Sequence, residues 1–465
     1  MFGSRALLLS LLSLSACASY SDRLQGFRAT YGSGEFHAAE SQVDSLIENE
    51  TGVDPSLLAQ PKSLSRIAAV SADDGYLLLL EKGMARLGDG DPDSAIDLFR
   101  RGRDELDKHW RADVTDYMKS ALVDDTSLDY PGADYEHVLV RVMLALSDLL
   151  VGGQDALAYS LQINEKQEAI LGSTFGAEQG WAPREHYRRV AIGAYLEGVL
   201  QEGRLDPNEA ARAYRRALAY GCDASLVKDA IERVEHGRYA APGNGVVHVF
   251  LLVGRGPTLI ETVHPPTDLA TKLASLGVVL ATNRGAALAQ APVKVPAVLV
   301  TDQAPRPAEI RAEDNPPAHS ETLVNVNLVA TEQLEANLPW IVARALVRRT
   351  IKAVTIAALE GHERKHQDNG LATLGAVIAS LFWTATENAD TRNWSSLPAE
   401  IQCARLELPA GRHVVDIGGV EKAAVRVTAG RDSFLVVVRP NLGRSGAVLV
   451  DSWSKPDSDT PGPTP

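Results

Sequence analysis

The residues His362-Glu363-Arg364-Lys365-His366 match the spacing H-E-x-x-H. On a helix, two histidines at this spacing lie on one face and can bind a single Zn²⁺, while the glutamate can activate a water molecule. Glu387 follows His366 by 21 residues and could supply a third ligand from a following helix. These side chains define one hypothesis, a zinc-dependent hydrolase that uses His362, His366 and Glu387.

The residues around this motif favour a different interpretation. Arg364 and Lys365 place two positive charges where a dication would bind. Glycines and polar residues on both sides are typical of a solvated helix end. We therefore expect His362 and His366 to lie at an exposed helix terminus, and we predict no metal, no other cofactor and no enzymatic activity.

Cys17 is the second residue with distinctive chemistry. It follows Leu14, Ser15 and Ala16, which end a short apolar run after a single basic residue. This is the pattern of a lipoprotein signal peptide over residues 1–16, because the apolar run is too short to span a bilayer and small residues precede the cysteine. Acyl chains such as palmitate on Cys17 would then anchor the mature chain. The alternative is an ordinary secretory signal with a chance cysteine.

The residue after Cys17 indicates a compartment. Ala18 stands where lipoproteins retained at the inner membrane carry aspartate, so the sequence is similar to lipoproteins of the outer membrane of Gram-negative cells. We therefore expect a lipid-anchored protein that faces the periplasm and contacts the membrane through its anchor.

Composition limits the class of partner. The chain has 465 residues, 45% hydrophobic residues and a formal net charge of −14. It can bury at least two cores. The acidic balance argues against nucleic acid or anionic lipid as a direct partner. Two further cysteines, Cys222 and Cys403, could form a disulfide or remain buried thiols.

The amino half, residues 17–238, has the apolar spacing of helices throughout. Small and aromatic residues recur in it at offsets that resemble the tetratricopeptide (TPR) helix pair, in which small residues allow a close helix crossing. The alternative is an ordinary helical bundle; a TPR-like solenoid would present a concave face to a protein partner. The residues expected to pack within these repeats are Gly83, Ala95 and Phe99 in one unit and Gly198, Ala210 and Tyr214 in a second. In the second unit, Asp206 and Pro207 are expected to begin the second helix as its cap and first-turn proline.

The carboxy half changes character after a linker rich in proline and glycine, at residues 239–245. We expect a multidomain α+β protein, with a mixed α/β domain over 246–399, a small β-sandwich-like module over 400–454 and a disordered tail over 455–465. The segments expected to be strands are 246–253, 259–263, 293–301, 322–329 and a carboxy-terminal meander of 405–408, 413–417, 423–427 and 433–438. The expected helices are 331–360 and 371–388.

Four residues stand close together before the expected module. Asp390 and Arg392 can form a charge-assisted ion pair, Trp394 can fill an apolar gap, and Pro398 can direct the chain into the next strand. We prefer this structural role. The alternative is an exposed recognition patch, where aromatic and arginine side chains often bind a partner.

These features together resemble a family of uncharacterised proteobacterial lipoproteins. The resemblance rests on the acylated amino terminus, on helix pairs that include residues 135–139, on the turn at 254–257 and on the segment from Asp390 to Pro398. It implies a role in the cell envelope, in association with lipoproteins that activate peptidoglycan synthases, and it transfers no catalytic residue. We therefore predict a scaffold or adaptor that binds another envelope protein and serves cell-envelope or peptidoglycan maintenance.

Overall fold

The computed structural model of the protein describes residues 19–55, 75–110, 130–173, 187–237, 239–265, 293–300, 303–313, 315–363 and 389–456. For residues 347–363 it describes the helical backbone only. The expected signal peptide, with Leu14, Ser15, Ala16 and Cys17, lies outside the described residues, as does most of the expected tail.

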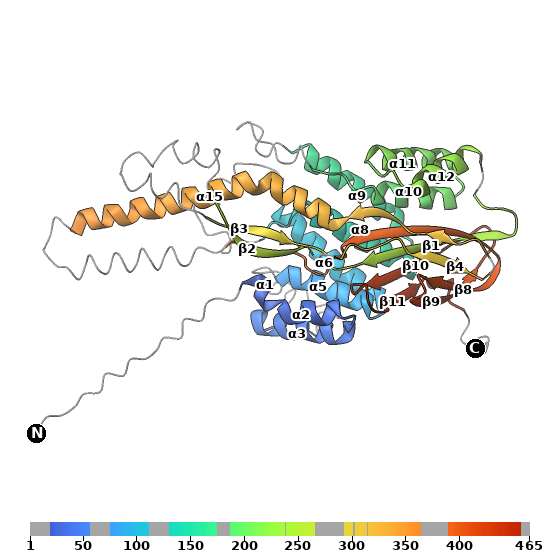
Figure 1. Cartoon of the computed structure of the whole chain (residues 1–465), viewed down its shortest axis with the longest axis horizontal. Helices are drawn as coiled ribbons and strands as arrows, with labels where there is room; N and C mark the ends of the chain where they lie inside the picture. The colour runs from blue at the N-terminus through green and yellow to red at the C-terminus, as the bar shows by residue number, and fades with distance from the viewer. Residues whose placement is uncertain are drawn as a thin grey trace, which may run out of the picture.

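Every regular element described between residues 19 and 237 is a helix, as the sequence predicts for this half. Helices that follow one another in the chain pack against each other (Figure 1). Their bounds are α1 (Tyr20–Arg23), α2 (Gln25–Gly32), α3 (Phe36–Thr51), α5 (Gly75–Gly88), α6 (Pro92–His109), α8 (Asp134–Val151), α9 (Ala156–Leu171), α10 (Ile192–Gly203), α11 (Pro207–Ala219) and α12 (Ser225–Glu235).

Helices α6 and α11 both begin with an aspartate N-cap followed by proline. The side chain of Asp206 accepts a hydrogen bond from the Glu209 amide at 3.2 Å, and proline occupies the first turn of α11. Asp91 caps α6 in the same way, with the Ser94 amide at 3.1 Å. Aspartate satisfies an amide that has no partner within the helix, and proline lacks the donor that would be orphaned there. The sequence predicted the cap at Asp206.

The described strands all follow residue 243 and form three sheets. The largest has five strands in the order β11-β10-β1-β7-β6; a second has four, β5-β4-β8-β9; and β2 and β3 form a two-stranded ribbon. The strand bounds are β1 (Asn244–Val253), β2 (Thr258–His264), β3 (Val293–Leu299), β4 (Glu309–Ala312), β5 (Ala318–His319), β6 (Glu321–Asn325), β7 (Glu400–Pro409), β8 (Gly411–Ile417), β9 (Glu421–Val427), β10 (Asp432–Arg439) and β11 (Ala447–Val450). The chain is therefore an α+β protein with its helices mainly in the amino half.

Strand β1 lies at the centre of the five-stranded sheet, parallel to β10 and antiparallel to β7. Both of its faces are buried, which explains its continuous apolar sequence. Val247, Val249 and Leu251 share one core with the four-stranded sheet. Phe250 and Leu252 share the other core with the helices of the amino half. The five-stranded sheet thus lies between the helices and the second sheet (Figure 1).

Strands from both sides of residue 400 are hydrogen-bonded in the same sheets. β1 pairs with β7 and β10, and β4 pairs with β8. The expected segments 246–399 and 400–454 therefore build two sheets jointly. β1 itself begins at Asn244, within the expected linker.

The prediction that the four carboxy-terminal strands form a meander is wrong, because not all consecutive strands pair with each other. Strands form at all four expected positions, but β7 belongs to the five-stranded sheet and β8 to the four-stranded one. The turn at Pro409–Gly411 passes the chain from one sheet to the other, and β10 then returns to pair in parallel with β1. Local alternation predicts strands, but the partners of a strand depend on residues far away in the chain.

The expected strand 322–329 is too long. β6 ends at Asn325, whose side chain accepts a hydrogen bond from the Leu328 amide at 2.8 Å and so caps a helix. This helix, α15 (Val326–Glu363), begins before the predicted position and packs on β3. The second expected helix, 371–388, lies outside the described residues. None of the described helices has both the length and the apolar character needed to cross a bilayer.

Candidate functional site

The segment Ala389–Pro398, which we call the buried segment, has no strand or helix and yet is almost completely buried. Trp394 has no exposed surface. Backbone amides buried without secondary structure must find acceptors elsewhere, because an unpaired buried amide costs about 1–3 kcal/mol. The geometry of this site follows from where those acceptors lie.

Two glutamates, Glu81 on α5 and Glu136 on α8, supply the acceptors; we call them the carboxylate pair. Glu81 accepts hydrogen bonds from the Ser395 amide at 2.7 Å, the Ser395 hydroxyl at 2.7 Å and the Ser396 amide at 3.0 Å. Glu136 accepts one from the Trp394 amide at 2.7 Å. Three successive amides of the buried segment are therefore bound by side chains of the amino-terminal helices.

The second oxygen of Glu136 is also fully used. It accepts hydrogen bonds from the Ala133 amide at 3.0 Å and the Tyr130 hydroxyl at 2.9 Å. Sequence reasoning missed both members of the carboxylate pair. One feature of the sequence could have revealed Glu81, because it directly follows the four leucines of residues 77–80. A single acid in an apolar run of this kind indicates a buried carboxylate with hydrogen-bond partners.

Side chains of the buried segment complete its attachment. The Trp394 ring lies 5.8 Å from the Phe99 ring, centroid to centroid, and its indole N–H donates to the Ser396 hydroxyl at 3.1 Å. The Asn393 amide group donates to the Pro257 carbonyl at 2.8 Å, at the start of β2. The segment thus contacts both the helices and the ribbon.

The ion pair expected between Asp390 and Arg392 is present. The Arg392 guanidinium donates to both carboxylate oxygens, at 2.9 and 2.7 Å, and lies 5.4 Å from the centre of the Tyr130 ring. Pro398 is buried directly before β7. With Trp394 fully buried, these four residues do not form an exposed patch; they occupy the structural place that we preferred.

The turn at residues 254–257 binds the end of the buried segment. Gly254 has φ of +74°, a conformation that favours glycine, and the Gly256 amide donates to the Leu397 carbonyl at 2.8 Å. A Cβ atom on Gly256 would lie 2.4 Å from that carbonyl oxygen. Both glycines are therefore needed for the backbone of the turn to approach the segment.

The carboxylate pair is electrostatically unusual. Burial raises the pKa of Glu81, although the hydrogen bonds from Ser395 and Ser396 oppose the shift. Burial likewise raises the pKa of Glu136 to about 7, against hydrogen bonds from Trp394, Ala133 and Tyr130. A carboxyl group with such a pKa suits proton transfer. Here, however, the oxygens are occupied by backbone and hydroxyl donors, which gives the pair a structural function.

The residues expected to pack within the helix pairs meet as their spacing suggests. A Cβ atom on Gly83 would lie 2.5 Å from the Phe99 ring, and one on Gly198 would lie 2.5 Å from the Tyr214 ring. The intervening Ala95 and Ala210 are fully buried. Phe99 therefore contacts both its helix partner and Trp394 of the buried segment.

The zinc hypothesis lies at the edge of the described structure. His362 belongs to the last turn of α15, but its side chain is not described, and His366 and Glu387 lie outside the described residues. The exposed helix end therefore stays the prediction, and the zinc site stays its alternative.

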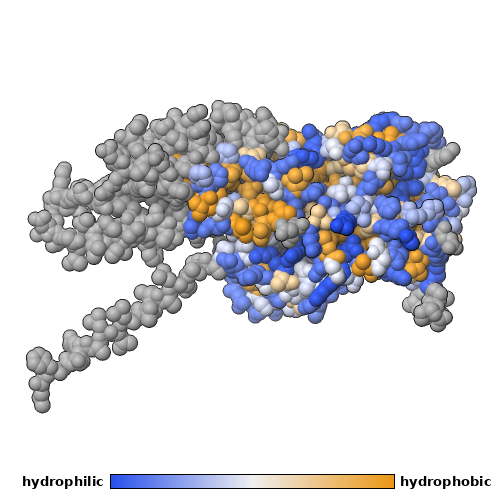
Figure 2. All heavy atoms as spheres, in the orientation of Figure 1, coloured by the Kyte–Doolittle hydropathy of each residue, from blue (hydrophilic) through white to orange (hydrophobic). Residues whose placement is uncertain are grey.

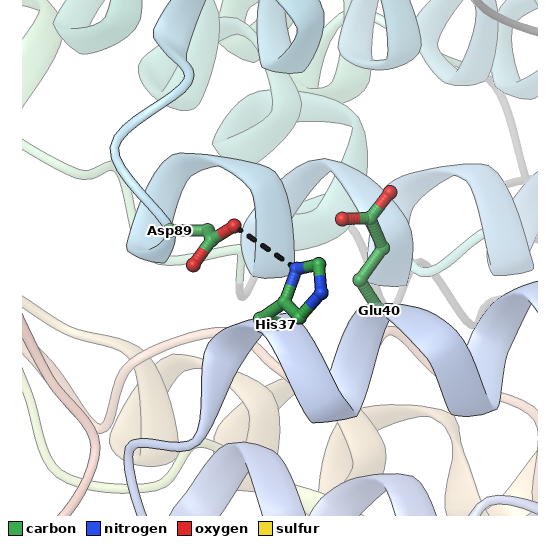
Figure 3. A group of neighbouring side chains, drawn as sticks. All are labelled: His37, Glu40 and Asp89. Carbon is green, nitrogen blue, oxygen red and sulfur yellow. Dashed lines mark ion pairs between the residues drawn. The ribbon is translucent and has the colours of Figure 1, made fainter.

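Among the described residues, one other group has a geometry that could hold a metal: His37, Glu40 and Asp89 (Figure 3). Its chemistry does not fit a cation site. Glu40 is bound by Arg86 at 2.6 Å and Lys82 at 3.4 Å, and these two cations already neutralise it. The His37 side chain is 83% exposed and lies 3.5 Å from Asp89. We interpret the group as two sets of ion pairs, an exposed one between His37 and Asp89 and a buried one around Glu40.

The two cysteines do not form a disulfide. Cys222 and Cys403 are both free and buried. The Cys403 thiol on β7 lies 3.7 Å from the Tyr195 hydroxyl, and burial raises its pKa to about 12. Such a thiol is protonated and unreactive at neutral pH.

Comparison of this chain with models of protein families, with curated proteins and with solved structures finds no match.

Replacing Glu81 by alanine should lower the free energy of unfolding by at least about 3 kcal/mol, because two amides and a hydroxyl would lose their buried acceptor. Urea titration followed by circular dichroism measures this. The control is Glu48→Ala on α3, where the glutamate is exposed, and its effect should stay within about 0.5 kcal/mol. Equal stability of the two variants would contradict the role of Glu81.

Glu136 should make stability depend on pH. Its folded-state pKa of about 7 lies above the ordinary value of 4.5, so the folded protein binds the extra proton between these values. The stability due to protonated Glu136 is therefore full below about pH 4.5 and lost as the pH rises through about 7. Between about pH 5 and pH 8 the wild type should lose roughly 2 to 3 kcal/mol relative to Glu136→Gln, which cannot titrate. Urea titrations at each pH measure this difference. If the free energy of unfolding changes with pH in the same way for the wild type and for Glu136→Gln, the pKa of Glu136 is not raised.

Proposed function

We propose that this protein is a lipoprotein, anchored through Cys17 in the outer membrane and facing the periplasm, that acts as a protein-binding scaffold or adaptor in cell-envelope or peptidoglycan maintenance. The observation that supports it best is the short path from the proposed anchor to the folded body. Ser19 caps α1 by accepting a hydrogen bond from the Asp22 amide at 3.2 Å, and Tyr20 and Leu24 are buried in the helical core. A lipid on Cys17 would therefore hold the body directly beside the bilayer.

The arrangement of helices supports binding of a protein partner. Pairs of adjacent helices cross closely at a glycine that faces an aromatic ring, at Gly83 with Phe99 and at Gly198 with Tyr214. This is similar to TPR helix pairs, which commonly bind peptides or proteins. The two facing sheets are likewise similar to a β-sandwich, although their strands come from residues 244–450 rather than from 400–454 alone.

The internal face of the helices already has an occupant. Glu81 and Glu136 bind the backbone of residues 394–396, as TPR-like grooves bind extended peptides. The partner of this scaffold would therefore meet a different surface. The helices also expose apolar side chains, Leu161 on α9, Leu218 on α11 and Leu205 in the turn before α11, and we propose these as the first positions to test for contact.

A non-enzymatic role fits the buried carboxylates, because Glu81 and Glu136 use their oxygens for hydrogen bonds with the chain itself.

The alternative remains a zinc-dependent hydrolase at His362, His366 and Glu387. It has one supporting observation: α15 extends through Glu363, so His362 is helical as the motif requires. Stoichiometric zinc that is lost in His362→Ala and His366→Ala would favour the hydrolase.

Metabolic labelling with an alkyne analogue of palmitate tests the anchor. Wild-type protein should carry the label and sediment with outer membranes, because acyl chains on Cys17 partition into lipid. Cys17→Ala should be unlabelled and should not sediment with outer membranes. Wild-type protein without label would end the proposal of a lipoprotein.

In-cell photocrosslinking tests the scaffold. A photoreactive residue at Leu205 or Leu161 should give a discrete adduct with an envelope protein, and the same residue at buried Leu144 should give none. Absence of any specific adduct at Leu161, Leu205 and Leu218, despite correct membrane anchoring, would contradict a partner on these helices.

A further inference from the structure

A buried ion pair closes one end of the core between the two facing sheets. Arg439, the last residue of β10, donates from Nη1 to Glu421, the first residue of β9, at 3.1 Å. Both side chains are buried. Arg439 lies on the same face of β10 as Leu435 and Val437, which pack against the four-stranded sheet. The ion pair therefore joins the two sheets.

This ion pair uses only part of the Arg439 guanidinium. A guanidinium has five N–H groups, and within the described residues its one acceptor is the Glu421 carboxylate. Nε is buried and has no hydrogen-bond partner. A buried donor without an acceptor is costly, so such a group is typical of a site that receives a further acceptor.

A short segment that begins at Pro305 and ends at Ala308 crosses this end of the core. A Cβ atom on Gly254 would lie 3.2 Å from the Pro305 ring, and the Gly254 amide donates to the Arg439 carbonyl at 2.9 Å. A Cβ atom on Gly418 would lie 3.6 Å from Ala308 and 3.9 Å from Nη1 of Arg439. The segment therefore extends from the backbone of Arg439 to its guanidinium.

Arg306 brings a second guanidinium to the same place. It stands between Pro305 and Pro307, and the fixed φ angles of the prolines hold this part of the segment extended. Arg306 is exposed, and it forms no ion pair with any residue that the structure describes. The segment thus presents an unneutralised positive charge beside Arg439.

The other charges on the adjoining strands cancel. Glu309 pairs with Arg311 at 2.9 Å, and Asp416 pairs with Lys422 at 3.7 Å. Glu421 balances Arg439 in the same way. The charge of Arg306 therefore remains, in a chain whose formal net charge is −14. A ligand with a single negative charge would neutralise it.

A carboxylate matches both the charge and the geometry. Nε and Nη2 lie on the same edge of a guanidinium, and this is an edge through which arginine binds the two oxygens of a carboxylate. In Arg439 the contact with Glu421 uses Nη1 and leaves that edge for another ligand. Figure 2 shows hydrophilic and apolar side chains intermixed over the carboxy-terminal sheets, so polar groups must provide specificity there.

We infer that Arg439 and Arg306 form a carboxylate-binding site at this end of the two sheets. The carboxylate accepts hydrogen bonds from Nε and Nη2 of Arg439, and the positive charge of Arg306 attracts it. The carboxylate belongs to a peptide C-terminus or to a small organic acid. This inference goes beyond the proposed scaffold and does not depend on an anchor at Cys17.

NMR spectroscopy of the full chain with ¹⁵N-labelled arginine tests the site. The probes are acetate, acetyl-trialanine and acetyl-trialanine amide. The Nε–H resonance of Arg439 is identified by its absence in Arg439→Lys, which keeps a positive charge beside Glu421. Both carboxylates should shift this resonance saturably, and the amide should not. Tighter binding of acetyl-trialanine than of acetate assigns a peptide C-terminus, whereas equal binding assigns a small acid.

Arg306→Gln should weaken the binding of both carboxylates at least about tenfold, because a charged partner is lost. The matched control is Arg204→Gln. Arg204 is also exposed and has no ion pair with the described residues. It follows Gly203, which lies beside Asp432 at the opposite end of β10 from Arg439. The control should bind both carboxylates as the wild type does.

Three results would overturn the inference. If neither carboxylate shifts the Arg439 resonance, its remaining donors are bound by water. If Arg306→Gln and Arg204→Gln bind the carboxylates equally well, Arg306 is not part of the site. If inorganic phosphate binds more tightly than either carboxylate, the assignment of a carboxylate is wrong.

Discussion

Two buried carboxylates bind the main chain of a segment that has no secondary structure of its own, and the rest of the architecture depends on this interaction. Glu81 and Glu136 accept the amides of Trp394, Ser395 and Ser396. Hydrogen bonds in a dry interior are strong, and leaving the donors unpaired there would be costly. The helices and the segment therefore form together or not at all.

This interaction links the two halves of the molecule because of where the segment leads. Directly after Pro398 the chain enters β7, which pairs with β1 at the centre of the five-stranded sheet. On the helical side, Trp394 packs on Phe99, whose ring also fills the space above Gly83. One chain of contacts thus runs from α5 through α6 and the buried segment to the sheet.

The sequence predicted those features that depend on neighbouring residues. The apolar run at 246–253 is a buried strand, Asp206 caps α11, and Asp390 pairs with Arg392. It did not predict strand order, because β1 pairs in parallel with β10 and no local pattern encodes that choice. It also missed Glu81 and Glu136. A single acid after four leucines indicates a buried partner, but the partner lies more than 300 residues away in the chain. Sites assembled from such distant segments can be found only when the fold is known.

Native-state hydrogen exchange of the Trp394, Ser395 and Ser396 amides tests the central claim most directly. If the carboxylate pair unites the helices with the sheet, these amides should exchange only by the global opening that also exposes the β1 amides, with the same free energy. Exchange that is orders of magnitude faster than in β1, while α5 and α8 stay protected, would show that the segment is a peripheral loop and would contradict the account.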